Sequence, residues 1–202
     1  MITIIDYGLG NIQAFVNIYK QYNIPYCTAK NADELLNASH LILPGVGAFD
    51  WAMQRLEASG MRQALDDLVL IDHVPVLGIC VGMQMMANFS EEGQLAGLGW
   101  IQGEVKRFDS RLFSTKTTLP HMGWNDVQLK EHPLFTGIFN SRFYFLHSYF
   151  FSPESSDQIL AETHYGKLFP ASVGNKNIFG VQFHPEKSHH WGEQLLNNFA
   201  QL

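Results

Sequence analysis

The chain has 202 residues, of which 46% are hydrophobic and 16% are charged. A chain this long and apolar can bury a sizeable core, which excludes intrinsic disorder, and its length predicts a single domain spanning residues 1–202. Nineteen acidic residues against thirteen basic ones give a net charge of −6. That balance disfavours proteins that wrap nucleic acid, because phosphate contacts need clustered lysine and arginine.

The cysteine content and the first residues bear on the cellular compartment that we expect for the protein. Two cysteines, Cys27 and Cys80, are too few for a disulfide framework. The first ten residues, MITIIDYGLG, lack the basic start and the long apolar stretch of a signal peptide. No apolar run approaches the ~18 residues of a membrane span. We therefore expect a reduced, cytoplasmic, globular protein.

The first 90 residues alternate between short apolar runs and helical patterns. Buried strands are predicted at 2–5, 25–29, 41–43 and 75–79, the third stopped by the turn 44–47. Helices are predicted at 12–19, at 49–70 with an interruption near Gly60, and at 82–88. A further helix is predicted to begin at a capping box formed by Asn31 and Glu34. Strands that alternate with helices predict βαβ units and a parallel sheet.

The second half of the chain is richer in β-structure. Strands are predicted at 100–108, 122–129, 143–151, 159–164 and 178–183. A final helix carries Trp191, Leu195 and Phe199 at every fourth position. The predicted fold class is α/β: a three-layer sandwich with a mostly parallel central sheet and an added antiparallel or mixed β region in the C-terminal half.

The most informative stretch is Gly-Ile-Cys-Val-Gly, centred on Cys80. A predicted strand runs into it and a helix follows, as in the nucleophile elbow of hydrolases, with cysteine in place of serine. The flanking glycines suit a sharp turn, and the helix N-terminus favours the thiolate. The backbone N–H of Val81 is a candidate oxyanion donor. The alternative is a small buried cysteine at a tight strand end.

A base for this thiol is predicted near the C-terminus. His184 and Glu186 are two residues apart after the strand at 178–182, with a proline between them. They fit an imidazole and its orienting carboxylate behind Cys80. His189 and His190 lie nearby, but no further cysteine or spaced carboxylate completes a zinc ligand set, so no metal is expected.

Other short motifs are less specific when each is taken alone. The turn Pro44-Gly45-Val46-Gly47 follows a strand and is a candidate second oxyanion donor, although by itself it fits an ordinary turn. His121 and His147 lie in aromatic-rich strands, and singly each fits a hydrogen-bonded core or surface residue better than a catalyst. Gly8-Leu9-Gly10-Asn11 lacks the third glycine and the ribose-binding acid of a dinucleotide loop.

The Cys80 motif, followed about a hundred residues later by Gln-Phe-His-Pro-Glu, resembles the class I (triad) glutamine amidotransferases. The resemblance covers the whole chain. Within the family, five segments resemble the glutaminase subunits of imidazole glycerol phosphate synthases: 7–11, 44–47, 120–125, 147–149 and 184–188. One departure is Val81, where leucine is commoner; its expected role is a backbone N–H, so the change has little consequence.

The resemblance implies a role for each matching residue. Cys80 attacks the side-chain amide of glutamine, giving a glutamyl thioester and ammonia, while His184 is the general base and acid and Glu186 orients it. Gly47 and Val81 supply backbone donors to the oxyanion. The glutamine-binding contacts are implied to be Gln84, Glu92, His147, Ser148 and Tyr149. No cofactor is implied.

The resemblance also implies a partner. That partner is implied to be a (β/α)₈-barrel cyclase, which forms a heterodimer with this chain. The ammonia is implied to pass through the barrel to a nucleotide, which is converted into imidazole glycerol phosphate and an aminoimidazole carboxamide ribotide in histidine biosynthesis. The subunit interface is implied to include Asn11, Trp124, Tyr144 and Lys187. The glycines of the 44–47 turn allow a peptide to flip, so we expect the isolated chain to be a poor glutaminase until its partner and the partner's ligand bind.

Three alternatives remain open from the sequence. A paralogous glutaminase subunit would supply ammonia to an ATP-dependent sugar amidotransferase in surface-polysaccharide biosynthesis. A non-catalytic scaffold would keep the motifs only as packing, which the intact Cys80, His184 and Glu186 disfavour. A cysteine hydrolase of another substrate is disfavoured by the implied glutamine contacts.

Overall fold

The computed structural model describes residues 1–109, 111 and 117–202. Its central sheet consists of β1 Ile2–Ile5, β2 Tyr26–Ala29, β3 His40–Gly45, β4 Val76–Cys80, β8 Gln128–Leu129, β11 Ile159–Tyr165, β12 Lys167–Asn175 and β13 Ile178–Val181. These strands lie in the order β2-β1-β3-β4-β13-β12-β11-β8. The first five in that order pair in parallel, and the last three are added antiparallel.

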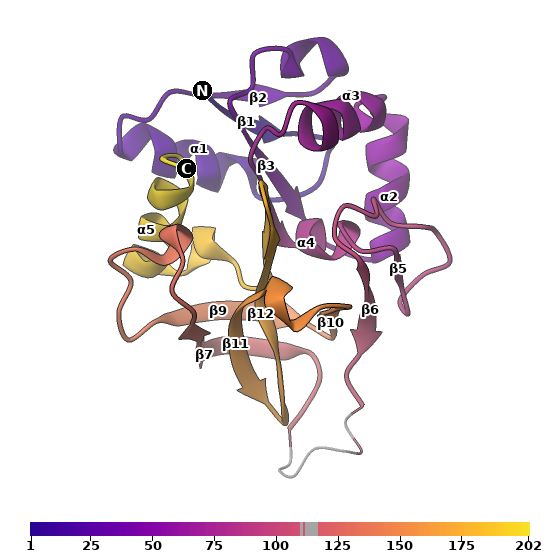
Figure 1. Cartoon of the computed structure of the whole chain (residues 1–202), viewed down its shortest axis with the longest axis vertical. Helices are drawn as coiled ribbons and strands as arrows, with labels where there is room; N and C mark the ends of the chain where they lie inside the picture. The colour runs from indigo at the N-terminus through magenta and orange to yellow at the C-terminus, as the bar shows by residue number, and fades with distance from the viewer. Residues whose placement is uncertain (110, 112–116) are drawn as a thin grey trace.

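Helices cover both faces of this sheet. They are α1 Ile12–Gln21, α2 Phe49–Ala58, α3 Arg62–Asp66, α4 Val81–Met85 and α5 His189–Phe199. Figure 1 shows α1 and α5 on one side of the sheet and α2 and α3 on the other. Every residue of β1 and β4 is buried, as expected for parallel strands between two helical layers. The predicted three-layer α/β sandwich is confirmed, and none of the described helices is long and apolar enough to cross a membrane.

Two smaller sheets pack beside the central one. One is three-stranded, with β5 Phe89–Ser90, β6 Gly103–Arg107 and β10 Tyr149–Pro153, and the other pairs β7 His121–Asp126 with β9 Arg142–His147. The single strand predicted at 143–151 is therefore wrong: the chain breaks at Ser148 and its two halves join different sheets. This break places His147 and Tyr149 on either side of a corner, which matters for the site.

The strand β12 was not predicted because a proline interrupts its sequence. Pro170 donates no N–H, and proline is rare inside a sheet. Pro170 lies opposite Glu162 of β11, and the register of that pairing shifts between Ile159 and Glu162. The strand β12 pairs with β13 only from Ser172 onward, so Pro170 has a paired strand on one side alone, as prolines of edge strands do.

The strand β3 is longer than predicted. Pro44 and Gly45 do not stop it but pair with Ile79 and Cys80 of β4. The neighbouring β1 pairs with β3 only as far as Ile42, so Pro44 lies where the ladder on that side has ended. The predicted turn 44–47 is therefore half strand, and its first residues are held directly against the Cys80 end of β4.

Two predicted helical regions differ from their patterns: one is shorter, and the other is divided. The capping box at Asn31 is present, since its side chain accepts from the Glu34 N–H, but it caps a single 3₁₀ turn, Ala32–Leu35. The region 49–70 is divided, as predicted, near Gly60, whose φ is +70°. After α3 it continues as one wide turn, Asp67–Ile71.

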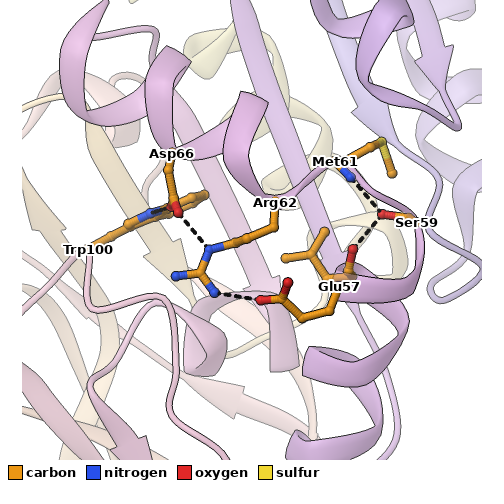
Figure 2. Close-up of polar contacts among 7 residues, drawn as sticks. Glu57, Ser59, Met61, Arg62, Asp66 and Trp100 are labelled. Carbon is orange, nitrogen blue, oxygen red and sulfur yellow. Dashed lines mark hydrogen bonds and ion pairs between the residues drawn. The ribbon is translucent and has the colours of Figure 1, made fainter.

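A polar cluster ties the corner between α2 and α3 together (Figure 2). The Arg62 guanidinium contacts Glu57 of α2 at 3.0 Å and Asp66 of α3 at 2.7 Å. Asp66 also accepts a 2.6 Å hydrogen bond from the indole N–H of Trp100. The cluster joins both helices to the segment leading into β6.

Candidate active site

Cys80 is the last residue of β4, directly before the first turn of α4. Its backbone has φ +54° and ψ −112°, a conformation that side-chain-bearing residues rarely adopt. Such strain costs about 1–3 kcal/mol and concentrates at functional sites. The geometry is that of a nucleophile elbow, in which the side chain projects from a sharp strand-to-helix turn.

Glycines at this elbow are required by the close packing of α4 against β3. A Cβ added to Gly82 would lie 2.0 Å from the carbonyl oxygen of Leu43. A Cβ added to Gly45 would lie 2.3 Å from the backbone nitrogen of Gly82. The glycines therefore allow the end of β3, with its 44–47 segment, to lie against the N-terminus of α4.

His184 and Glu186 lie at the end of the neighbouring strand, β13. The Nδ1 atom of His184 is 2.9 Å from the Glu186 carboxylate, and both side chains are nearly fully buried. Burial opposes the charged imidazolium, but hydrogen bonds and charges from Cys80 and Glu186 outweigh it and raise the pKa of His184 to about 10. The Glu186 contact fixes Nδ1 as the donor, which leaves Nε2 for the sulfur.

A cavity of about 330 Å³ opens beside the Cys80 side chain. Its volume is within the range of small-molecule sites. Ten of the sequence-predicted site residues line it: Gly47, Cys80, Val81, Gln84, Glu92, His147, Ser148, Tyr149, His184 and Lys187. They come from at least five separate segments, so the fold brings the proposed nucleophile, base, oxyanion donors and glutamine contacts to one place.

The candidate oxyanion donors lie on two sides of the elbow. Val81 is the first residue of α4, where backbone N–H groups have no partner within the helix. Gly47 has φ +86°, which suits glycine. The Tyr7 hydroxyl donates a 2.6 Å hydrogen bond to the carbonyl of Pro44, and so holds the start of the 44–47 segment in place.

Glu92 connects the cavity to α2. Its carboxylate accepts a 2.9 Å hydrogen bond from the N–H of Phe49, the first residue of that helix. Burial raises the pKa of Glu92, the Phe49 hydrogen bond opposes that shift, and the charge of Asp50 adds to it. The carboxylate is thereby anchored at the cavity wall, where it can meet a cationic group of a bound ligand.

Three of the four predicted interface residues, Trp124, Tyr144 and Lys187, form a cluster that adjoins the cavity. Trp124 stacks on His189 at 5.2 Å and contacts Tyr144 edge-on at 6.2 Å, and the Lys187 ammonium lies 5.8 Å from the Tyr144 ring. Asn11 caps α1 by accepting a hydrogen bond from the Ala14 N–H. Of the four, Lys187 belongs to both the cluster and the cavity wall.

Sequence reasoning missed the roles of three residues around the site. Met122 and Leu146 form a cross-strand pair adjoining Trp124 and Tyr144, so one face of the β7–β9 sheet is an exposed apolar patch, 63% exposed at Met122 and 39% at Leu146. Alternation along both strands was the available signal. Gln182 was also missed; it contacts Cys80 across 102 residues of sequence, and no local pattern reports that contact.

The chain resembles known proteins in sequence and in fold. The family model for class-I glutamine amidotransferases matches residues 3–202. A crystal structure of a glutamine amidotransferase superposes with a TM-score of 0.76 at 17% identity, covering 100% of this chain and 99% of that one. The structure of PurLQS from Thermotoga maritima gives 0.72 at 16% identity, covering 99% and 97%. At these identities the structures show a shared fold.

Curated relatives are much closer in sequence. Proteins named imidazole glycerol phosphate synthase subunit HisH are 56% identical in Bdellovibrio bacteriovorus and 48% identical in Leptospira interrogans. A HisH 2 subunit from Pseudomonas aeruginosa is 47% identical. Each alignment covers 100% of both chains. The chain therefore belongs to the class-I glutamine amidotransferase family, among the HisH subunits of imidazole glycerol phosphate synthase.

Proposed function

We propose that this chain, acting as a single domain, is the cytoplasmic glutaminase subunit of an imidazole glycerol phosphate synthase. The observation that carries the proposal is the arrangement of three side chains at adjoining strand ends: Cys80 and His184 line one cavity, and Glu186 contacts the far nitrogen of His184. An elbow cysteine paired with a carboxylate-oriented imidazole is the arrangement that acyl transfer from an amide needs.

The proposed reaction follows from the positions of these groups. The Cys80 thiolate attacks the side-chain amide carbon of glutamine, and the N–H groups of Val81 and Gly47 stabilise the oxyanion. The His184 imidazolium gives its proton to the amide nitrogen of the tetrahedral intermediate, the C–N bond breaks, and ammonia departs to leave a glutamyl thioester. Neutral His184 then takes a proton from water, the resulting hydroxide attacks the thioester, and glutamate and the thiolate are released.

Recognition of glutamine falls to the rest of the cavity wall. We propose that Gln84, Glu92, His147, Ser148 and Tyr149 contact the substrate. Glu92 is the acidic group among them, and it suits the substrate's α-ammonium. Lys187 and His184 are the cationic groups among the described residues that line the cavity, and both have other partners, so the α-carboxylate is left to backbone and hydroxyl donors of the 147–149 corner.

The ammonia acceptor is proposed to be a (β/α)₈-barrel cyclase docked on the apolar patch of the β7–β9 sheet. Leu146 supports this placement because it belongs to both the patch and the cavity wall, so the patch adjoins the point where ammonia is formed. The names of the relatives support this acceptor over a sugar amidotransferase, since those of Bdellovibrio, Leptospira and Pseudomonas are all named as subunits of imidazole glycerol phosphate synthase.

Glutamate release tests the proposal directly. The chain is mixed with a barrel cyclase and the cyclase's nucleotide substrate, and glutamate is measured with Cys80→Ser as the matched control. We expect glutamate from the wild type and none above background from Cys80→Ser. Activation only by an ATP-dependent sugar amidotransferase would move the function to the paralogous pathway, and equal rates for both proteins would refute a cysteine mechanism.

A further inference from the structure

We propose that Gln182 is a further catalytic residue, whose side-chain amide donates a hydrogen bond to the Cys80 sulfur and stabilises its thiolate form. The inference rests on the proposed function, in which Cys80 is the nucleophile. Gln182 follows β13 and is fully buried, and its Nε2 atom lies 3.7 Å from the sulfur. This separation is a hydrogen-bond distance for an acceptor as large as sulfur.

The orientation of the Gln182 amide is determined by Gln84. The Gln84 side-chain nitrogen donates to the Gln182 carbonyl oxygen at 3.0 Å and to the backbone carbonyl of Tyr149 at 3.1 Å. With its oxygen facing Gln84, Gln182 must present its NH₂ group to the sulfur. A flipped amide would place a carbonyl oxygen against a thiolate and two NH₂ groups against each other.

Gln84 is itself held by a fixed acceptor. The Tyr149 carbonyl also accepts from His147 Nδ1 at 2.8 Å, and His147 Nε2 lies 2.9 Å from His121 Nδ1. With both imidazoles neutral, this chain of hydrogen bonds has one consistent direction: His121 donates to His147, and His147 donates to Tyr149. The network therefore extends from a buried histidine pair to the nucleophile.

The ionisation state of the Cys80 sulfur determines whether it needs a hydrogen-bond donor such as Gln182. The thiol form can donate to the Leu146 carbonyl, 3.9 Å away, whereas the thiolate has only acceptor capacity and needs donors. His184 is one donor, but in the proposed reaction it gives its proton to the departing amide nitrogen. A glutamine amide keeps its hydrogens at every step, so Gln182 can stabilise the thiolate both before attack and as the leaving group of the thioester.

Alkylation of Cys80 measures this effect without using glutamine. Iodoacetamide is reacted with wild type, Gln182→Met, which keeps the shape without the donor, and Gln182→Glu, which places a carboxylate oxygen at the sulfur. Peptide mapping quantifies modification of Cys80 across a range of pH. We expect the modification profile of Gln182→Met to be displaced to higher pH by about one unit, with a larger displacement for Gln182→Glu.

A matched control is available in Asn198, another buried amide. It donates to the carbonyls of Leu134 and Thr136, away from the cavity. Asn198→Leu removes buried hydrogen bonds at comparable structural cost, and its Cys80 profile is expected to match the wild type. A Gln182→Met profile that also matches the wild type would overturn the proposal, because a purely structural glutamine would not change the reactivity of the sulfur.

A second measurement does not depend on variants of Gln182 folding. In wild-type protein labelled with ¹⁵N-glutamine, the Gln182 side-chain amide protons should shift with pH as Cys80 ionises, and should not shift in Cys80→Ser. Equal behaviour in both proteins would overturn the proposal. If the alkylation profiles differ as expected but no partner elicits glutamate release, the role of Gln182 toward the thiolate stands and the proposed substrate is wrong.

Discussion

Cys80, His184 and Glu186 differ in how directly each takes part in bond making. In the proposed mechanism, Cys80 forms the covalent bond, His184 moves protons, and Glu186, whose carboxylate lies 2.9 Å from His184 Nδ1, orients the imidazole. Removing either of the first two groups removes a step, whereas removing the third only loosens an orientation. Substituting Cys80 or His184 should therefore reduce the rate of glutamate release more than substituting Glu186.

We predict that Cys80→Ala and His184→Ala each reduce kcat for glutamine by about 10³-fold or more in the complex, and that Glu186→Gln reduces it by about 10- to 10²-fold. Initial rates of glutamate release give the values, and circular dichroism verifies folding. A Glu186→Gln enzyme as inactive as Cys80→Ala would contradict the role of an orienting residue.

The elevated pKa of His184 predicts the pH dependence of the acylation step. At a pKa of about 10, the His184 imidazolium, the proposed proton donor to the departing amide nitrogen, is fully populated at neutral pH. It is lost as the pH rises through about 10. We therefore expect single-turnover acylation to persist to about pH 9 and to decline above it, as followed by rapid-quench detection of the first equivalent of ammonia. A decline centred near the ordinary histidine pKa of about 6.5 would show that His184 is not paired in this way.

At the scale of elements, the corner between α2 and α3 depends on one arginine. Arg62→Leu keeps the aliphatic stem but removes the contacts to Glu57 and Asp66. Because the pair with Asp66 is partly buried and shared with Trp100, we expect a loss of about 1–2 kcal/mol in the free energy of unfolding.

Urea unfolding measures this loss, and the adjacent Gln63 provides the control. Gln63 makes an exposed hydrogen bond to Asp67 one turn along, so Gln63→Leu should change stability by less than about 0.5 kcal/mol. If both variants lose the same amount, the Arg62 cluster has no special part in joining α2 to α3.

The histidine pair between β7 and β9 predicts acid sensitivity. Burial lowers the pKa of His121 from 6.5 to about 4, and burial together with the charge of His121 lowers that of His147 to about 3. Well above pH 6.5 both histidines are neutral in the folded and unfolded states. Between pH 6.5 and about 4 only the unfolded chain takes up these protons, so the free energy of unfolding falls as the pH falls.

We expect a cost of about 2 kcal/mol per buried histidine between about pH 7 and about pH 5. Urea unfolding at the two pH values tests this in wild type, in His121→Asn and in the control His190→Asn, which changes an exposed residue of α5. His121→Asn should show a smaller loss on acidification than the other two. Equal losses in all three would mean that the pair is not the source of acid sensitivity.

Local sequence patterns are sufficient to predict some elements of the fold and the site, but not others. The alternating strands and helices of the first 90 residues, and the elbow at Cys80, follow from short-range patterns, since each needs only its own neighbours. The strand β12 was missed because Pro170 argues against a strand locally, whereas pairing on both sides maintains it. Gln182 was missed because its orientation depends on Gln84, which no local pattern connects to it.

At the scale of the whole molecule, the apolar patch of the β7–β9 sheet should determine partner binding. Trp124 and Met122 are aromatic and flexible apolar groups of the kind that anchor interfaces. We predict that Trp124→Ala weakens binding to the cyclase by about tenfold or more, measured by calorimetry, while Cys80 alkylation in the isolated chain is unchanged. Leu36→Ser, which alters a 76% exposed side chain at a distant turn, is the control.

The isolated chain should be a weak glutaminase. The 44–47 segment is half strand and half glycine turn, so a peptide within it can change orientation without disturbing β3. Loss of one oxyanion donor costs about 10²–10³ in rate, which is sufficient for a switch. We expect glutamate release to rise by about that factor when the partner and its nucleotide bind; high activity of the chain alone would contradict the switch.

Ammonia formed at Cys80 should reach the product of the partner, and the amide nitrogen of glutamine tests this most directly. Glutamine labelled with ¹⁵N at its side-chain amide is given to the complex of this chain with a barrel cyclase and its nucleotide substrate, in the presence of excess unlabelled ammonium. We predict that ¹⁵N enters the imidazole product with wild type and not with Cys80→Ser. Product labelled equally with both proteins, or label found only as free ammonium, would contradict the proposed function.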